Sequence, residues 1–177
     1  MDFKTLLPDF NAIGKTDWAK PDLKIDTKDT FKLVALAGAV LMLVFVFLPW
    51  TSISVTNPFN IAGEGSKLGI ATWYGVFALI MALVAVVGML YKHTSLTFCA
   101  AVLGVIFGII GLMSFPEMEI TFANKGKEIT ETIKNKEEWE EGIKMMKSSS
   151  LSHLGAILFT VASVVTAAGA YLKITKK

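Results

Sequence analysis

The sequence of 177 residues contains no arginine, a single cysteine and only two histidines. All of its 17 basic residues are lysine, and 15 acidic residues leave a formal net charge of +2. Lysine offers a point charge rather than the planar fork that suits phosphate and base recognition, so we expect no nucleic-acid partner. Because Cys99 is the only cysteine, no internal disulfide can form, whatever the redox compartment.

Recognisable patterns for catalysis and metal binding are missing as well. His93 and His153 lie near the ends of different apolar stretches, and neither has cysteines or carboxylates clustered around it. The sequence has no Gly-x-Ser-x-Gly elbow and no nucleophile with a candidate base. The Gly-Glu-Gly-Ser segment at residues 63–66 lacks the spacing of a dinucleotide-binding loop, and we interpret it as a flexible loop. We therefore expect no enzyme activity, no catalytic residues, no metal and no cofactor.

Charge is almost absent from four long apolar stretches, in which Lys32 is the only charged residue. Each has about 20 residues, which at a helical rise of 1.5 Å matches a hydrocarbon core of roughly 30 Å. The stretches cover residues 31–50, 69–91, 95–114 and 151–172. The sequence therefore predicts an all-α membrane protein, an antiparallel bundle of four transmembrane helices lying in the lipid bilayer.

Small residues recur on the third apolar stretch at the spacing of one helix face. Such ridges let helix backbones approach closely in lipid, where close packing replaces the hydrophobic drive. We expect this ridge to pack inside the bundle, and dimerisation is the alternative. The predicted packing residues are Ala100, Gly104, Gly108 and Gly111.

Lysines near the ends of the apolar stretches indicate an orientation in the membrane. Only Lys67 and Lys147 lie comparably close to the ends on the other side. We therefore expect a multi-pass protein of a bacterial cytoplasmic (inner) membrane with both termini cytoplasmic. Residues 1–30 would form a cytoplasmic tail, and residues 51–68 and 115–150 would form outer loops of the membrane domain at 31–177. The lysines on the predicted inner side are Lys28, Lys32, Lys92, Lys173, Lys176 and Lys177.

The two outer loops carry patterns of their own. Polar and apolar residues alternate over residues 51–56 and 117–123, which predicts two strands that pair into a short sheet. Residues 125–147 place apolar side chains on one stripe of a helical wheel. Such an amphipathic helix can cover its own bundle, lie in the membrane interface or dock a partner. The sequence therefore predicts a small extracytoplasmic α+β cap. The candidate partner-docking residues are Ile129, Ile133, Trp139, Ile143 and Met146.

A Leu-Pro-Trp exit at residues 48–50 is followed by the strand-like segment and a glycine-rich return to the next apolar stretch. This order resembles small uncharacterised bacterial membrane proteins with four spans, a resemblance that implies no particular function. Claudin-like proteins are similar in layout only, because the Trp…Gly-Leu-Trp…Cys…Cys signature is absent here.

These observations favour a non-enzymatic accessory or structural subunit that acts through protein–protein contacts, with a membrane protein or a second copy as partner. The alternative is a small transporter or channel component, for which a polar path is needed. An enzyme of lipid or peptide chemistry that uses Glu117 and Glu119 is a third hypothesis, and no spacing favours it. For the transporter or channel alternative, the side-chain hydroxyls that could line a polar path through the apolar stretches are those of Thr97, Thr160, Ser163 and Thr166.

Overall fold

The computed structural model describes residues 6–21, 29–124 and 127–176. Most of the predicted tail at residues 1–30 is covered, but residues 1–5 and 22–28 lie outside the described part, as do residues 125 and 126 of the predicted outer helix.

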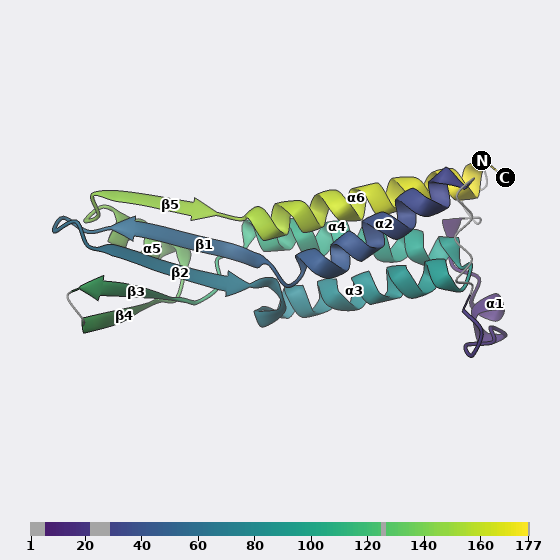
Figure 1. Cartoon of the computed structure of the whole chain (residues 1–177), viewed down its shortest axis with the longest axis horizontal. Coiled ribbons are helices and arrows are strands. Elements are labelled where there is room, and N and C mark those ends of the chain that lie inside the picture. The colour runs from purple at the N-terminus through teal and green to yellow at the C-terminus, as the bar shows by residue number, and fades with distance from the viewer. Residues whose placement is uncertain (1–5, 22–28, 125–126, 177) are drawn as a thin grey trace.

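Figure 1 shows a helical half and a sheet half joined end to end, with strands and helices along one long axis. In chain order the elements are α1 (Phe10–Gly14), α2 (Thr30–Phe45), β1 (Pro49–Thr56), β2 (Ala62–Leu68), the short turn η2 (Gly69–Ala71), α3 (Trp73–Leu90), α4 (Thr94–Met113), β3 (Met118–Asn124), β4 (Lys127–Ile133), α5 (Lys136–Ile143), β5 (Ser148–Ser152) and α6 (Leu154–Thr175).

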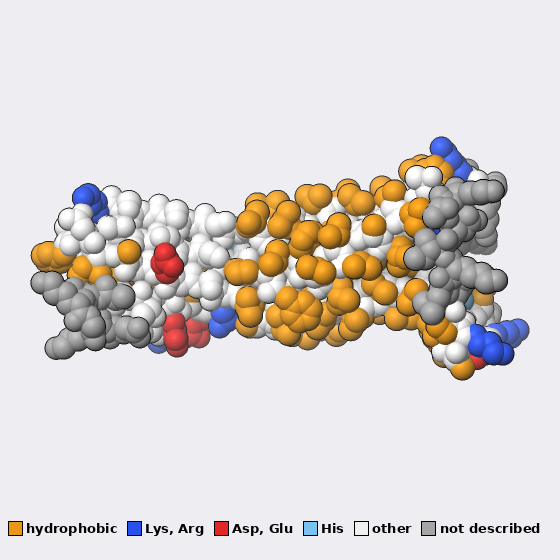
Figure 2. Space-filling model, in the orientation of Figure 1, with side chains coloured by type: hydrophobic (Ala, Val, Ile, Leu, Met, Phe, Trp, Pro, Cys, Tyr) orange, Lys and Arg blue, Asp and Glu red, His pale blue; other side chains and the backbone are white. Residues whose placement is uncertain are grey.

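Four helices, α2, α3, α4 and α6, pack side by side in the helical half (Figure 1). Within the described residues, three of them are long and apolar enough to cross a membrane: α3, α4 and α6, with 18, 20 and 22 residues. Figure 2 shows hydrophobic side chains gathered over this half, whereas the same face of the sheet half carries few. An apolar belt around packed helices is the surface that a bilayer covers.

The prediction of an all-α bundle with four transmembrane helices is wrong on two counts. The described chain contains a five-stranded antiparallel sheet, so the fold is mixed α and β. Among the described helices only three qualify as candidate spans, because α2 has 16 residues and ends at Phe45. The first predicted span extends to Trp50. Pro49, however, lacks the amide that would continue a helix, and it begins strand β1 instead. At 1.5 Å per residue α2 covers about 24 Å, less than a hydrocarbon core of roughly 30 Å.

The sheet has the strand order β4-β3-β2-β1-β5. The predicted strands at residues 51–56 and 117–123 are confirmed as β1 and β3, but they do not pair with each other, because β2 lies between them. The single helix predicted over residues 125–147 is wrong: within the described residues 127–147, the first part is strand β4 and only α5 is helical. Asn135 caps α5 by accepting a hydrogen bond from the Glu138 amide at 2.9 Å.

The two faces of the sheet differ in composition. One face carries a buried apolar cluster of Ile53, Val55, Met118, Ile120 and Phe122, which Trp139 of α5 joins. The cross-strand pairs place hydroxyl and acidic side chains together on the other face, for example Ser54 with Glu64 and Ser150. A strand presents successive side chains to opposite faces, so α5 covers the apolar face and leaves the polar face to solvent.

Polar contacts join the segments at the end of the molecule that lies opposite the sheet in Figure 1. Residues after α1 reach the turn between α3 and α4, where Thr16 Oγ1 lies 2.6 Å from His93 Nε2 and Tyr91 donates to the Trp18 carbonyl at 2.6 Å. Asp29 caps α2 by accepting from the Lys32 amide, and it pairs with Lys173 near the end of α6. These contacts place the start of α2 beside the end of α6.

Candidate functional site

The hydroxyls that a membrane path would need are engaged within the helical half. Thr97 donates to the Ala85 carbonyl of the neighbouring α3 at 3.0 Å. The three hydroxyls of α6 each donate to a carbonyl four residues earlier on the same helix, at 2.8 to 2.9 Å. A hydroxyl that donates to a main-chain carbonyl in this way can pack closely against a glycine of a neighbouring helix. These residues of α6 are Thr160, Ser163 and Thr166.

The predicted packing residues on α4 are all buried. Gly104 and Gly108 lie against Ser163 and Thr160 of α6, and Gly111 lies against the ring of Trp50. Ala100 belongs to a small cluster with Ala39 and Ala85, from α2 and α3. The ridge therefore faces inward, against helices of the same chain.

The predicted partner-docking residues are divided between packing and exposure. Trp139 is buried in the apolar cluster of the sheet, and three others are partly buried against that cluster: Ile133, Ile143 and Met146. Ile129 on β4 is 57% exposed. Most of this stripe therefore covers its own sheet and offers little free apolar surface to a partner.

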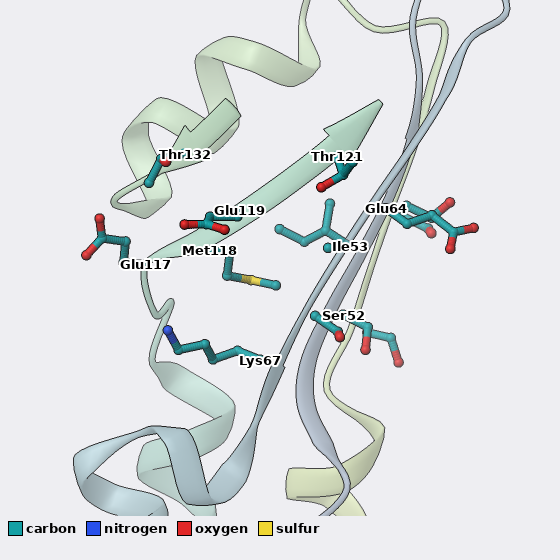
Figure 3. Close-up of a pocket in the computed structure, with 14 residues that line it drawn as sticks. Ser52, Ile53, Glu64, Lys67, Glu117, Met118, Glu119, Thr121 and Thr132 are labelled. Atoms are coloured by element: carbon teal, nitrogen blue, oxygen red, sulfur yellow. The ribbon is translucent and has the colours of Figure 1, made fainter. Parts of the chain in front are cut away.

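The polar face of the sheet forms an open groove of about 910 Å³. Residues of all five strands line it, and nearly all carry hydroxyl or charged side chains. Figure 3 shows Ser52 and Glu64 on one side of this groove and Glu119 and Thr132 on the other. The polar lining residues are Ser52, Ser54, Glu64, Ser66, Lys67, Glu117, Glu119, Thr121, Thr132, Ser150 and Ser152.

Toward the helices, the pairing between β2 and β3 ends and leaves a gap in the ladder. Their pairing consists of Gly63 with Phe122 and Glu64 with Thr121, and it does not continue toward the helices. Lys67 near the end of β2 and Glu117 just before β3 thus face a gap instead of a hydrogen-bonded partner strand. Figure 3 shows Lys67 extending toward the side of the gap on which Glu117 and Glu119 lie.

A second cavity, of about 460 Å³, continues from this gap to the end of the helices. Lys67 and Glu117 line both cavities. Tyr74 also lines the second cavity, but the residue is only 3% exposed and its hydroxyl is buried. Trp73, beside it in sequence, is 62% exposed. The residues lining this junction cavity are Lys67, Ala71, Thr72, Trp73, Tyr74, Ser114, Phe115, Pro116 and Glu117.

The two edges of the sheet are also unlike each other. Strand β4, at one edge, carries the charged side chain of Glu131. Strand β5, at the other edge, has the sequence Ser-Ser-Ser-Leu-Ser, and all five residues are exposed. Charged side chains on an edge strand discourage a further strand from pairing, and β5 has none.

The histidines lie apart and serve local contacts. His93 contacts Thr16 at the α1 end, whereas His153 Nδ1 lies 3.3 Å from the Trp50 carbonyl where the sheet meets the helices. In the described part of the chain no three metal-ligating side chains come together. Outside the apolar helices, the hydrogen bond from Lys173 lowers the pKa of Asp29 below its usual value of 3.8, with help from the Lys32 amide and against the effect of burial.

Sequence reasoning missed both the open edge and the junction cavity. A serine run carries little strand propensity, so nothing in it signalled β5. Adjacent aromatic residues such as Trp73 and Tyr74 are typical of a membrane–water interface and do not by themselves indicate a cavity. Comparisons with protein families, with curated proteins and with solved structures found no match to this chain.

Proposed function

We propose that the protein is a non-enzymatic membrane accessory subunit that presents its sheet to a strand of a protein partner. The open, uncharged outer edge of β5 carries this proposal. Every second residue of an edge strand leaves its main-chain N–H and C=O unpaired at the outer edge, and natural sheets usually protect such edges with charge or a covering element. The opposite edge, β4, has that protection and β5 does not. An added strand would therefore pair at β5, by the mechanism known as β-augmentation.

The direction of β5 argues for a different protein as the partner. Figure 1 shows β5 running along the same axis as α6, which it precedes directly. Two copies in one membrane, related by a twofold axis along the membrane normal, would bring their β5 strands together parallel and at equal height. Identical residues would then face each other amide to amide and carbonyl to carbonyl, which no ladder of hydrogen bonds allows. A strand from another protein has no such restriction.

We place the sheet outside a bacterial cytoplasmic membrane, with the α1 end on the cytoplasmic side. Lys92 and Lys173 at the α1 end support this orientation. The apolar composition of α3, α4 and α6 supports their insertion in a membrane. The sheet would then stand directly above the membrane. A partner that is itself anchored in the membrane could align its strand with β5.

The experiment compares the mass of the native particle for wild type and two edge variants. The full chain is extracted gently from its native membrane and weighed by native mass spectrometry. We expect wild type to carry a stoichiometric foreign subunit, Ser150→Lys on β5 to lose most of it, and the control Thr130→Lys on β4 to keep it. Both substituted residues are exposed on the polar face of an edge strand. A particle that contains this chain alone, or equal retention in both variants, would overturn the proposal.

The transporter alternative has less support. The four hydroxyls available for a path donate to backbone carbonyls inside the helical half. Flux of ions or small solutes through reconstituted protein would revive it.

A further inference from the structure

We propose that residues 6–20 form an interfacial anchor, in which Leu7, Phe10 and Trp18 insert into the lipid leaflet at the α1 end of the helical half. The anchor is a surface for lipid, and it lies at the opposite end of the molecule from the β5 edge. The inference depends on the helical half lying in a membrane. It does not depend on a protein partner at β5.

Contacts with α4 and with the turn between α3 and α4 hold the anchor in place. The contacting pairs are Leu6 with Cys99, Thr16 with His93, and Trp18 with Tyr91. The Trp18 ring also packs on the Tyr91 ring, with centroids 4.8 Å apart. Asp9 caps α1 by accepting from the amides of Asn11 and Ala12. The anchor is therefore a folded element with a fixed position on the helices.

The first of these contacts sets the depth of the anchor. Cys99 Sγ donates to the Leu6 carbonyl at 3.6 Å, and Leu6 is buried. Cys99 follows the first residue of α4, Thr94, by five positions, which is about 8 Å along the helix axis. Leu6 thus lies beside α4 and not beyond its end. Interfacial segments bury their apolar side chains roughly 5–10 Å into the boundary between headgroups and hydrocarbon, so the depth agrees.

Large apolar side chains of the anchor are exposed at this level. The exposed fractions are 53% for Leu7, 77% for Phe10 and 48% for Trp18. Figure 1 shows α1 to one side of the ends of the long helices, where a leaflet surrounding the bundle would lie. The lipid that covers the apolar surface of α3 and α4 would therefore continue onto these side chains. Tryptophan in particular prefers the boundary between hydrocarbon and water.

The charges of the anchor indicate which property of the lipid it recognises. Two acidic and two basic side chains lie within the described residues 6–21, so this segment has no net charge. Asp17 accepts from the Ala19 amide and pairs with Lys20 at 3.4 Å. A segment that binds anionic lipid carries an excess of lysine or arginine. Apolar burial is the attraction that remains, so we expect equal insertion into zwitterionic and anionic bilayers.

The test measures the depth of spin labels on the full chain in nanodiscs of phosphatidylcholine or phosphatidylglycerol. Collisions with oxygen report hydrocarbon, and collisions with a water-soluble nickel chelate report water. One label is placed at Gly14→Cys, one turn after Phe10, where a Cβ meets nothing within 4 Å. The matched control is Ala12→Cys, which is also exposed but lies about 200° around the helix from Phe10. Cys99→Ser in every labelled chain removes the native thiol and keeps a donor for Leu6.

We expect the Gly14→Cys label to lie about 5–10 Å into the boundary in both lipids, and the Ala12→Cys label to lie closer to water. Adding Leu7→Ser and Phe10→Ser should reduce the oxygen-to-nickel collision ratio at Gly14→Cys to that of the control. Equal ratios for the two labels would overturn the proposal and leave Phe10 to a protein partner in water. An unchanged ratio in the serine variant would also overturn it, as would insertion into phosphatidylglycerol alone.

A label in the middle of α6 separates this proposal from the membrane placement on which it rests. Val164→Cys replaces an exposed residue of that helix and should report hydrocarbon. If it does and Gly14→Cys reports water, the anchor fails by itself. A Val164→Cys label in water would overturn both. Since β5 is unchanged in all of these chains, the results are independent of partner loss in Ser150→Lys.

Discussion

Replacing Gly111 with alanine tests how closely α4 approaches the buried ring of Trp50. A Cβ at Gly111 would lie 2.6 and 2.7 Å from two carbons of that ring, distances that real Cβ contacts essentially never show. The ring is not free to move away. It is fully buried, it packs on Phe159 with centroids 5.2 Å apart, and its Nε1 donates to the Phe45 carbonyl at 3.0 Å. Either the indole shifts and strains that hydrogen bond, or α4 moves away from the ring.

The expected cost follows from three contributions. Overpacking a filled core costs about 1–3 kcal/mol. Strain or loss of the indole hydrogen bond adds about 1 kcal/mol. The higher helix propensity of alanine offsets about 1 kcal/mol of this loss. We therefore expect Gly111→Ala to reduce the free energy of unfolding by about 1–3 kcal/mol.

The assay is reversible unfolding of the full chain in mild detergent, followed by circular dichroism as a denaturing detergent is added. Gly142→Ala is the control, because a Cβ there meets nothing within 4 Å in α5. This control should leave the unfolding midpoint unchanged or raise it slightly. If Gly111→Ala were as stable as wild type, the close approach between α4 and Trp50 would be refuted.

Two further predictions concern the ends of the molecule. Because Lys173 lowers the pKa of Asp29 in the folded state, the pair stabilises the fold above the usual carboxyl pKa of 3.8, and this stability is lost as pH falls below it. Asp29→Asn keeps a capping side chain, so it should remove this pH dependence from unfolding curves measured between pH 6 and pH 3, and an unchanged slope would contradict the assignment. Trp139→Ala in α5 should lower the free energy of unfolding by about 3 kcal/mol and should speed proteolysis and amide exchange in the sheet half. Exposed Ile129→Ala on β4 should leave the free energy of unfolding and both rates unchanged. Equal effects of these two substitutions would contradict the packing of α5 on the sheet.

The apolar stretches predicted where helices lie but not where α2 ends. Hydropathy does not distinguish a residue buried in a membrane helix from one buried where a sheet meets the helices. Trp50 shows the difference: it ends the predicted span at residues 31–50, and the structure buries it completely as part of β1. Its burial depends on Gly69 and Gly155, where a side chain would collide with the ring. Such contacts between distant segments leave no periodic signal in the sequence.

Strand β4 was predicted as a helix because its spacing fits both structures. Ile129 and Ile133 are four residues apart, which places them on one face of a helix. Four is also a multiple of two, so the same pair shares one face of a strand. Pairing of Ile133 with Met118 and of Ile129 with Phe122 decides in favour of the strand. The sequence alone is compatible with a helix and with a strand at these positions. The helical spacing of apolar residues from Trp139 onward favoured a helix that begins before Ile129.

Strand β2, the glycine-rich segment interpreted as a loop, determines both the sheet and the junction cavity. Its glycines are required by close approach, because a Cβ on Gly63 would lie 2.6 Å from the Phe122 ring and one on Gly65 2.5 Å from the Glu119 carbonyl oxygen. Low strand propensity concealed an element that tertiary contact demands. Once β2 lies between β1 and β3, Lys67 and Glu117 face the same gap although 50 positions separate them in the sequence. No local sequence pattern links these two charges. The glycines that concealed strand β2 therefore concealed the junction cavity as well.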